Sequence, residues 1–126
     1  MEERDVEECK KYCENKTSIH PNLNLNRTPD SIVCLDAKDN HLLGYSTGFQ
    51  IDGHTIAENE KIIFSLLSYF CQISENSPVF FVSLSHYPSL YEQSIHLGFI
   101  NLKNMFWMVK DGLLEIPSKS IYLPAI

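Results

Sequence analysis

The chain of 126 residues has the length of one domain, and its 44% apolar and 21% charged residues are typical of globular proteins. Its net charge of −6 argues against a nucleic-acid partner, whose phosphates would repel it. No segment approaches the ~18 uninterrupted apolar residues of a membrane helix, so we expect no membrane partner.

The first predicted element is a helix over about residues 4–15, with an inner face formed by Val6, Cys9, Cys13 and Tyr12. This charged start is neither a signal peptide nor an anchor, which predicts a cytoplasmic or nuclear protein that is not secreted. Cys9 and Cys13 stand one helical turn apart, but no second Cys/His pair has the spacing of zinc ligands. We therefore expect no metal, and reduced thiols that are at least half-buried.

A polar loop at residues 17–31 is followed by the strongest hairpin pattern of the chain. Two β-rich runs, at residues 32–35 and 42–50, flank the turn-forming residues 37–40. A helix is then predicted over about residues 58–73. Its apolar stripe consists of Ile62, Ile63, Leu66, Leu67, Phe70 and Ile73.

The second half of the chain begins with the apolar run "PVFFVSL", which predicts a central strand over residues 79–84. A crossover helix precedes this strand, so it should lie parallel to the strand before that helix. A second helix over about residues 89–97 should end at Gly98. The stretch "NMFWMVK" (104–110) predicts another strand, and the proline-broken tail 114–126 offers only a short edge pairing.

This order of elements predicts an α/β (α+β) protein with a mixed, mostly antiparallel sheet flanked by helices. It resembles the GNAT superfamily of N-acetyltransferases. The stretch "VFFVSLSHYPSLYEQSIHLGFINLKNMFWMVKDG" (79–112) is similar to the family's buried strand, short helix, Leu-Gly-Phe motif and final aromatic-Met strand. The stretch "VCLDAKDNHLLGYSTGF" (33–49) resembles its opening hairpin. The resemblance covers about residues 4–112, within one GNAT-like domain spanning 1–126.

The resemblance implies acetyl-CoA as a cofactor, with its pyrophosphate on backbone amides at the start of the central helix, and a small-molecule or peptide amine as the acceptor. The junction "GHTIAEN" also resembles the C-terminal half of tandem GNAT proteins, which have proline where this chain has His54. The chain would then be a stand-alone relative or a fragment of a longer tandem protein. The candidate cofactor-binding residues are Gly53, His54, Ile56, Ala57, Glu58 and Asn59.

The competing interpretation of this junction is an ordinary turn at Gly53 followed by a core helix that Thr55 or Asn59 caps. The junction has no Lys or Arg. Glu58 and Glu60 suit the helix dipole but repel a pyrophosphate.

Acetyl transfer needs a base for the ammonium group and an acid for the departing thiolate. In many GNAT enzymes the acid is a tyrosine four residues before the glycine of the Leu-Gly-Phe motif, where this chain has Ser94. The candidate catalytic residues are therefore Tyr91, one helical turn earlier, and His86, which follows the predicted central strand. The competing interpretation is a tyrosine packed on the sheet and a surface histidine.

Two functions stay open at this stage. One is a GNAT-type N-acetyltransferase that transfers an acetyl group to an unidentified amine. The other is a non-catalytic GNAT-like interaction or dimerisation module that has lost the acetyl-CoA signature. The bulky final strand and apolar tail predict that a companion domain or a second copy packs there, with Trp107 or Tyr122 at the contact.

Overall fold

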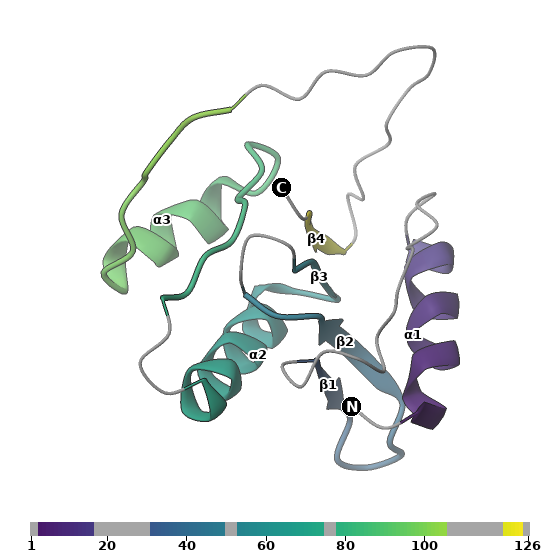
Figure 1. The fold of residues 1–126 in the computed structure, drawn as a ribbon. Helices are drawn as coiled ribbons and strands as arrows, with labels where there is room; N and C mark the ends of the chain where they lie inside the picture. Colours follow the sequence, from purple (N-terminus) through teal and green to yellow (C-terminus); the bar gives the residue numbers. More distant parts are fainter. Residues whose placement is uncertain (1–2, 17–30, 50–52, 75–77, 106–119, 125–126) are drawn as a thin grey trace.

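The computed structural model describes residues 3–16, 31–49, 53–74, 78–105 and 120–124 (Figure 1). These residues form the helices α1 (Glu3–Lys16), α2 (Glu60–Ile73) and α3 (Pro88–His96) and the strands β1 (Ile32–Leu35), β2 (Leu42–Ser46), β3 (Thr55–Ala57) and β4 (Ile121–Leu123). The strands form one sheet in the order β1-β2-β3-β4, and each neighbouring pair is antiparallel. The predicted class, α+β with helices flanking a sheet, is confirmed.

The helices cover both faces of this sheet (Figure 1). Successive side chains of a strand point to opposite faces, so the neighbours Ile56 and Ala57 of β3 enter different cores. One core joins α1 to the sheet and contains Val6, Cys9, Cys13, Leu42, Tyr45, Ile56 and Tyr122. The other joins α2 and the start of α3 to the sheet and contains Ile32, Phe49, Ala57, Ile63, Leu66, Leu67, Phe70, Tyr87, Leu90, Ile121 and Leu123.

Helix α1 has the inner face that its periodicity predicts. Cys9 and Cys13 are fully buried against the sheet, and Tyr12 packs beside them. The Tyr12 hydroxyl also donates a hydrogen bond to the carbonyl of Leu43 in β2, at 3.0 Å. The contact between α1 and β2 is therefore both apolar and hydrogen-bonded.

The docking of α1 predicts a fixed order of thiol reactivity. We expect iodoacetamide to modify the exposed Cys71 first, the half-buried Cys34 more slowly, and Cys9 and Cys13 only after unfolding. Burial also raises the pKa of Cys9 to about 12, so its thiol stays protonated at neutral pH. Time-resolved peptide mass spectrometry measures each rate, with urea-unfolded protein as the control. Modification of Cys9 as fast as that of Cys71 would contradict this packing.

The hairpin of β1 and β2 forms as predicted, with Val33 opposite Tyr45 and Ile32 opposite Ser46. Strand β2 ends at Ser46, earlier than the predicted end at residue 50. The reason is a change of backbone direction at Gly48, whose φ of 126° is outside the β region.

Helix α2 begins at Glu60, two residues later than expected, because Asn59 caps it: the Asn59 side chain accepts a hydrogen bond from the Ile62 amide. Four residues of the predicted stripe are buried: Ile63, Leu66, Leu67 and Phe70. At its ends the stripe is less covered, since Ile62 is half-buried and Ile73 is exposed.

The prediction of a central strand over residues 79–84 is wrong. This segment is half-buried and is not part of the sheet, and no described strand pairs in parallel. Among the described residues, its one backbone hydrogen bond to the region after β2 runs from the Phe80 amide to the Phe49 carbonyl, at 2.8 Å. The segment is apolar because it covers the α2 side of the core, where Val79, Phe81 and Leu84 pack.

Helix α3 and the C-terminal tail agree with their predictions. Helix α3 ends at His96, and Gly98 follows with a φ of 99°. Strand β4 is a three-residue edge strand beside β3. The Tyr87 hydroxyl connects these regions, because it donates to the Ser120 carbonyl and accepts from the Tyr122 amide. Of the strand predicted over 104–110, residues 104 and 105 are not in a strand and the others lie outside the described residues.

Candidate functional site

The predicted cofactor junction contains a strand that the sequence analysis did not anticipate. Ile56 and Ala57 belong to β3, are fully buried, and are paired with β2 on one side and β4 on the other. The Glu58 amide donates to the carbonyl of Leu43, at 3.0 Å. The backbone of these residues is thus used by the sheet, and Asn59 uses its side chain as the cap of α2.

Gly53 lies against the backbone of Gly48, where the chain leaves β2 and returns into β3. A Cβ at Gly53 would overlap the carbonyl group of Gly48. Two hydrogen bonds fix this approach, from the Thr47 amide to the His54 carbonyl and from the His54 amide to Thr47 Oγ1. Glycine is therefore required here for the contact between two parts of the chain.

The His54 ring packs against the side chains of Tyr45 in β2 and Tyr122 in β4. Its Nε2 lies 2.8 Å from the Tyr45 hydroxyl, and the two rings meet edge to face with their centroids 5.3 Å apart. Burial lowers the pKa of His54 to about 4, so the ring is neutral at pH 7. A neutral ring that is already hydrogen-bonded brings no positive charge to a phosphate.

His54 is the half-buried member of a polar group that we call the Tyr45 cluster, whose buried members are Cys9, Cys13, Tyr45 and Tyr122. The Tyr45 hydroxyl is also hydrogen-bonded to Cys13, and burial raises the pKa of the Tyr45 phenol. Burial likewise raises the pKa of Tyr122 to about 12. Neutral, hydrogen-bonded groups in a closed core suit packing rather than nucleophilic attack.

The sequence analysis did not include Tyr45 among its site residues. Its only signal was the Gly-Tyr pair of the second hairpin strand, which gives no information on the partner of the tyrosine.

The two candidate catalytic residues lie on the surface. His86 is exposed in the turn before α3. Tyr91 is exposed on α3, and its hydroxyl accepts from the Asn101 side-chain amide at 3.5 Å. Among the described residues, no hydrogen bond joins either side chain to residues 53–59. Ser94, at the position of the usual acid, is buried and donates to the Leu90 carbonyl within its own helix.

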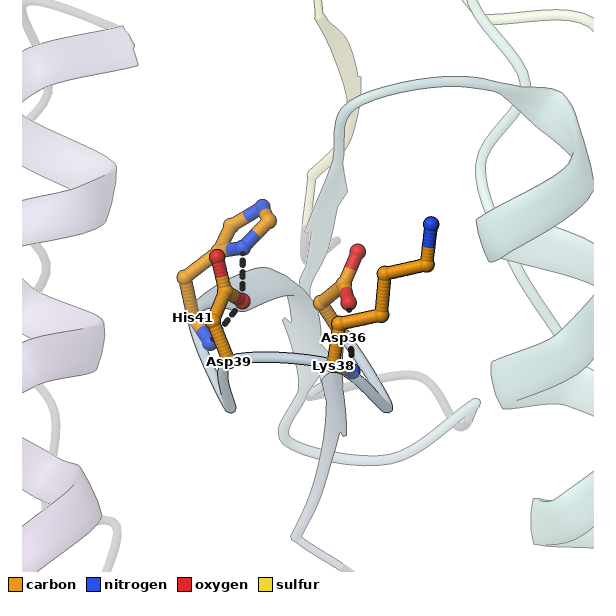
Figure 2. Close-up of polar contacts among 4 residues, drawn as sticks. All are labelled: Asp36, Lys38, Asp39 and His41. Carbon is orange, nitrogen blue, oxygen red and sulfur yellow. Dashed lines mark hydrogen bonds and ion pairs between the residues drawn. The ribbon is translucent and has the colours of Figure 1, made fainter.

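The hairpin turn brings together Asp36, Asp39 and His41, whose potential ligand atoms lie within 4.8 Å of one another (Figure 2). His41 Nδ1 is 2.6 Å from Asp39 Oδ1, and this hydrogen bond lowers the pKa of Asp39 and raises that of His41. Asp36 accepts a hydrogen bond from the Lys38 amide. Asp39 likewise accepts from the His41 amide, and these bonds account for the shape of the turn, since aspartates commonly bond to backbone two residues onward.

An open groove of about 840 Å³ runs along the outer side of α2, facing α3. Ser89 and Gln93 of α3 both donate to Glu60 at one end of it. Most of the residues around it have polar or charged side chains, and neither candidate catalytic residue is among them. The residues around the groove are Glu60, Lys61, Phe64, Ser65, Ser68, Tyr69, Gln72 and Gln93.

Fold and site together define a small α+β domain whose predicted cofactor junction is built into its sheet. No protein-family model, curated protein or solved structure matches the chain. In the part of the chain that the structure describes, no helix has the length and apolar character needed to cross a membrane.

Proposed function

We propose that this chain is a non-catalytic interaction module with a GNAT-like order of elements, which works by binding another polypeptide. The observation that most supports this proposal is the use of the junction backbone. Ile56 and Ala57 are paired on both sides within the sheet, and the Glu58 amide is bonded to Leu43. A pyrophosphate site needs amides that point to solvent at a helix start.

The arrangement of the candidate catalytic residues favours the same function. A GNAT-type transfer needs an acid and a base at the reacting atoms. His86 and Tyr91 are both exposed, and the Ser94 hydroxyl is bonded inside its helix. A polypeptide-binding role needs no such constellation.

The competing proposal is an acetyl-CoA-dependent N-acetyltransferase that acts on a small-molecule or peptide amine. In this structure its cofactor would have to use amides other than those of Ile56, Ala57 and Glu58. The start of α2 also carries Glu60, an acidic side chain in the first turn that repels a pyrophosphate.

The expectation that Trp107 or Tyr122 lies at or near a contact with a companion domain or a second copy stays a prediction. Tyr122 lies in β4 with only 8% of its surface exposed, so its side chain offers little area for such a contact. Replacing Tyr122 with Asp would put a charge into the core beneath α1 and would unfold the domain rather than weaken a contact. Trp107, the other predicted contact residue, lies outside the described residues.

The proposal predicts that acetyl-CoA does not bind. We expect isothermal titration with about millimolar acetyl-CoA or CoA to give no saturable heat, and the melting temperature to stay constant, because a ligand stabilises only the state it binds. A known acetyl-CoA-dependent acetyltransferase serves as the positive control, and circular dichroism verifies the fold. Saturable binding together with a raised melting temperature would overturn the module and favour the transferase.

A further inference from the structure

The longest run of exposed apolar side chains among the described residues begins in the middle of α3, at Tyr91. It extends from the helix into the segment after Gly98, and we call it the 91–105 surface. Its large apolar members, with their exposed fractions, are Tyr91 (44%), Ile95 (42%), Leu97 (65%), Ile100 (76%), Leu102 (69%) and Met105 (51%).

This surface is held in place by the helix beside it. The segment after α3 turns back along the helix (Figure 1), where the Phe99 amide donates to the Ser94 carbonyl and Asn101 reaches the Tyr91 hydroxyl. The Phe99 ring points inward, with its centroid 5.2 Å from that of Phe81. Phe99 and Asn101 therefore hold the start of the segment against the protein, while its apolar side chains Ile100, Leu102 and Met105 are exposed.

The size of this surface is close to what a stable dimer needs. With about 200 Å² for each large residue, the six exposed fractions give about 700 Å² of surface. The largest apolar patch of a typical monomer is about 300–600 Å². A standard protein interface buries about 800 Å² on each partner, and the polar residues between these side chains supply the remainder.

Charge favours a second copy of this same chain as the partner. The whole chain has a net charge of −6, so two copies repel each other over most of their surfaces. Residues 91–105 contain one acidic residue, Glu92, and one basic residue, Lys103, and are neutral together. In a twofold contact the same patch meets itself, and here it does so without net repulsion.

We propose that two copies of this chain form a dimer through the 91–105 surface. This inference rests on the proposed function, because it names the polypeptide that the interaction module binds. The sequence analysis expected the contact at the C-terminal strand and tail, whereas this proposal places it on α3 and the segment that follows α3.

Sedimentation velocity of the full chain, from about 1 to about 200 μM, tests the dimer. We expect wild-type protein to dimerise with a dissociation constant on the order of 10 μM. The double variant Ile100→Lys/Leu102→Lys should dimerise at least about tenfold more weakly, because buried ammonium groups would face each other. The matched control Leu35→Lys/Ile73→Lys changes the same residue types and charge at sites that are also exposed.

The dimer and the proposed function can be overturned by different results. A wild-type monomer over the whole range, or equal weakening in the control, overturns the dimer. Circular dichroism shows that each variant is folded, and a single variant, Ile100→Ser, replaces the double variant if that one unfolds. Acetyl-CoA binding overturns the module independently, whatever the oligomeric state is.

Discussion

Replacing Gly53 with alanine is expected to lower the free energy of unfolding by about 3 kcal/mol. The added Cβ would overlap the carbonyl group of Gly48. That carbonyl cannot move away easily, because two hydrogen bonds between Thr47 and His54 hold the two chain segments together next to the contact. One of the segments would have to shift, and the ends of β2 and β3 would shift with it.

Urea unfolding of wild type and Gly53→Ala measures this loss. Gly98→Ala is the control: its φ of 99° is unfavourable for alanine, but its Cβ would meet nothing within 4 Å. Its expected cost is only about 1 kcal/mol. If Gly53→Ala were as stable as wild type, glycine would not be needed for this contact, and its role in approaching a phosphate would return.

The elements that the sequence predicts well are those with a long local pattern. Helix α2 repeats its buried residues over about two turns, from Ile63 to Phe70, and α1 repeats its inner residues one turn apart. The hairpin depends on neighbouring residues and on an acidic turn. Such elements form from interactions that lie close together in the sequence, which a single sequence contains.

The errors concern pairing between distant parts of the chain. Strand β3 has only three residues, too few to show alternation, and it exists because β2 and β4 border it on both sides. Residues 79–84 have the composition of a central strand, but β4 occupies the place beside β3. An apolar composition indicates that a segment is buried, but it does not indicate which segment pairs with the strands of the sheet.

The structural setting of the candidate cofactor residues could not be predicted for the same reason. The junction at Gly53 has the residues of a loop that leads into a helix, and only the register of β3 shows that its amides face neighbouring strands. The contact of His54 with Tyr45 also depends on this register, which places Ile56 opposite Tyr45. The solvent-exposed phosphate loop stays a prediction for this junction, whereas the structure shows Ile56 and Ala57 paired with β2 and β4.

Acidification should destabilise the domain through His54. Its pKa is about 4 in the folded state because the ring is buried, compared with 6.5 in an unfolded chain. Above pH 6.5 the ring is neutral in both states, so its contribution to stability does not change with pH. Between pH 6.5 and 4 only the unfolded chain takes up the proton, and stability falls as the pH falls, by at most about 3 kcal/mol.

The groups around the His54 ring do not titrate within this pH range. Tyr45 of β2 and Tyr122 of β4 face it, and burial raises the pKa of both phenols, so neither changes charge between pH 4 and 7. A protonated His54 would carry a proton on both ring nitrogens, so the Tyr45 hydroxyl could then only accept from Nε2. It would also place a charge against the neutral rings of Tyr45 and Tyr122.

Urea unfolding of wild type and His54→Gln at half-unit steps from about pH 4.5 to 7.5 measures the contribution, since glutamine can still bond Tyr45 but does not titrate. We expect the wild-type stability to fall more steeply below pH 6.5 than that of His54→Gln. His41→Gln is the control: the bond to Asp39 raises the pKa of His41, so its contribution is present at low pH and is lost as the pH rises. Parallel pH profiles for wild type and His54→Gln would show that His54 is accessible to protons in the folded domain, and that the Tyr45 cluster is not closed beneath α1.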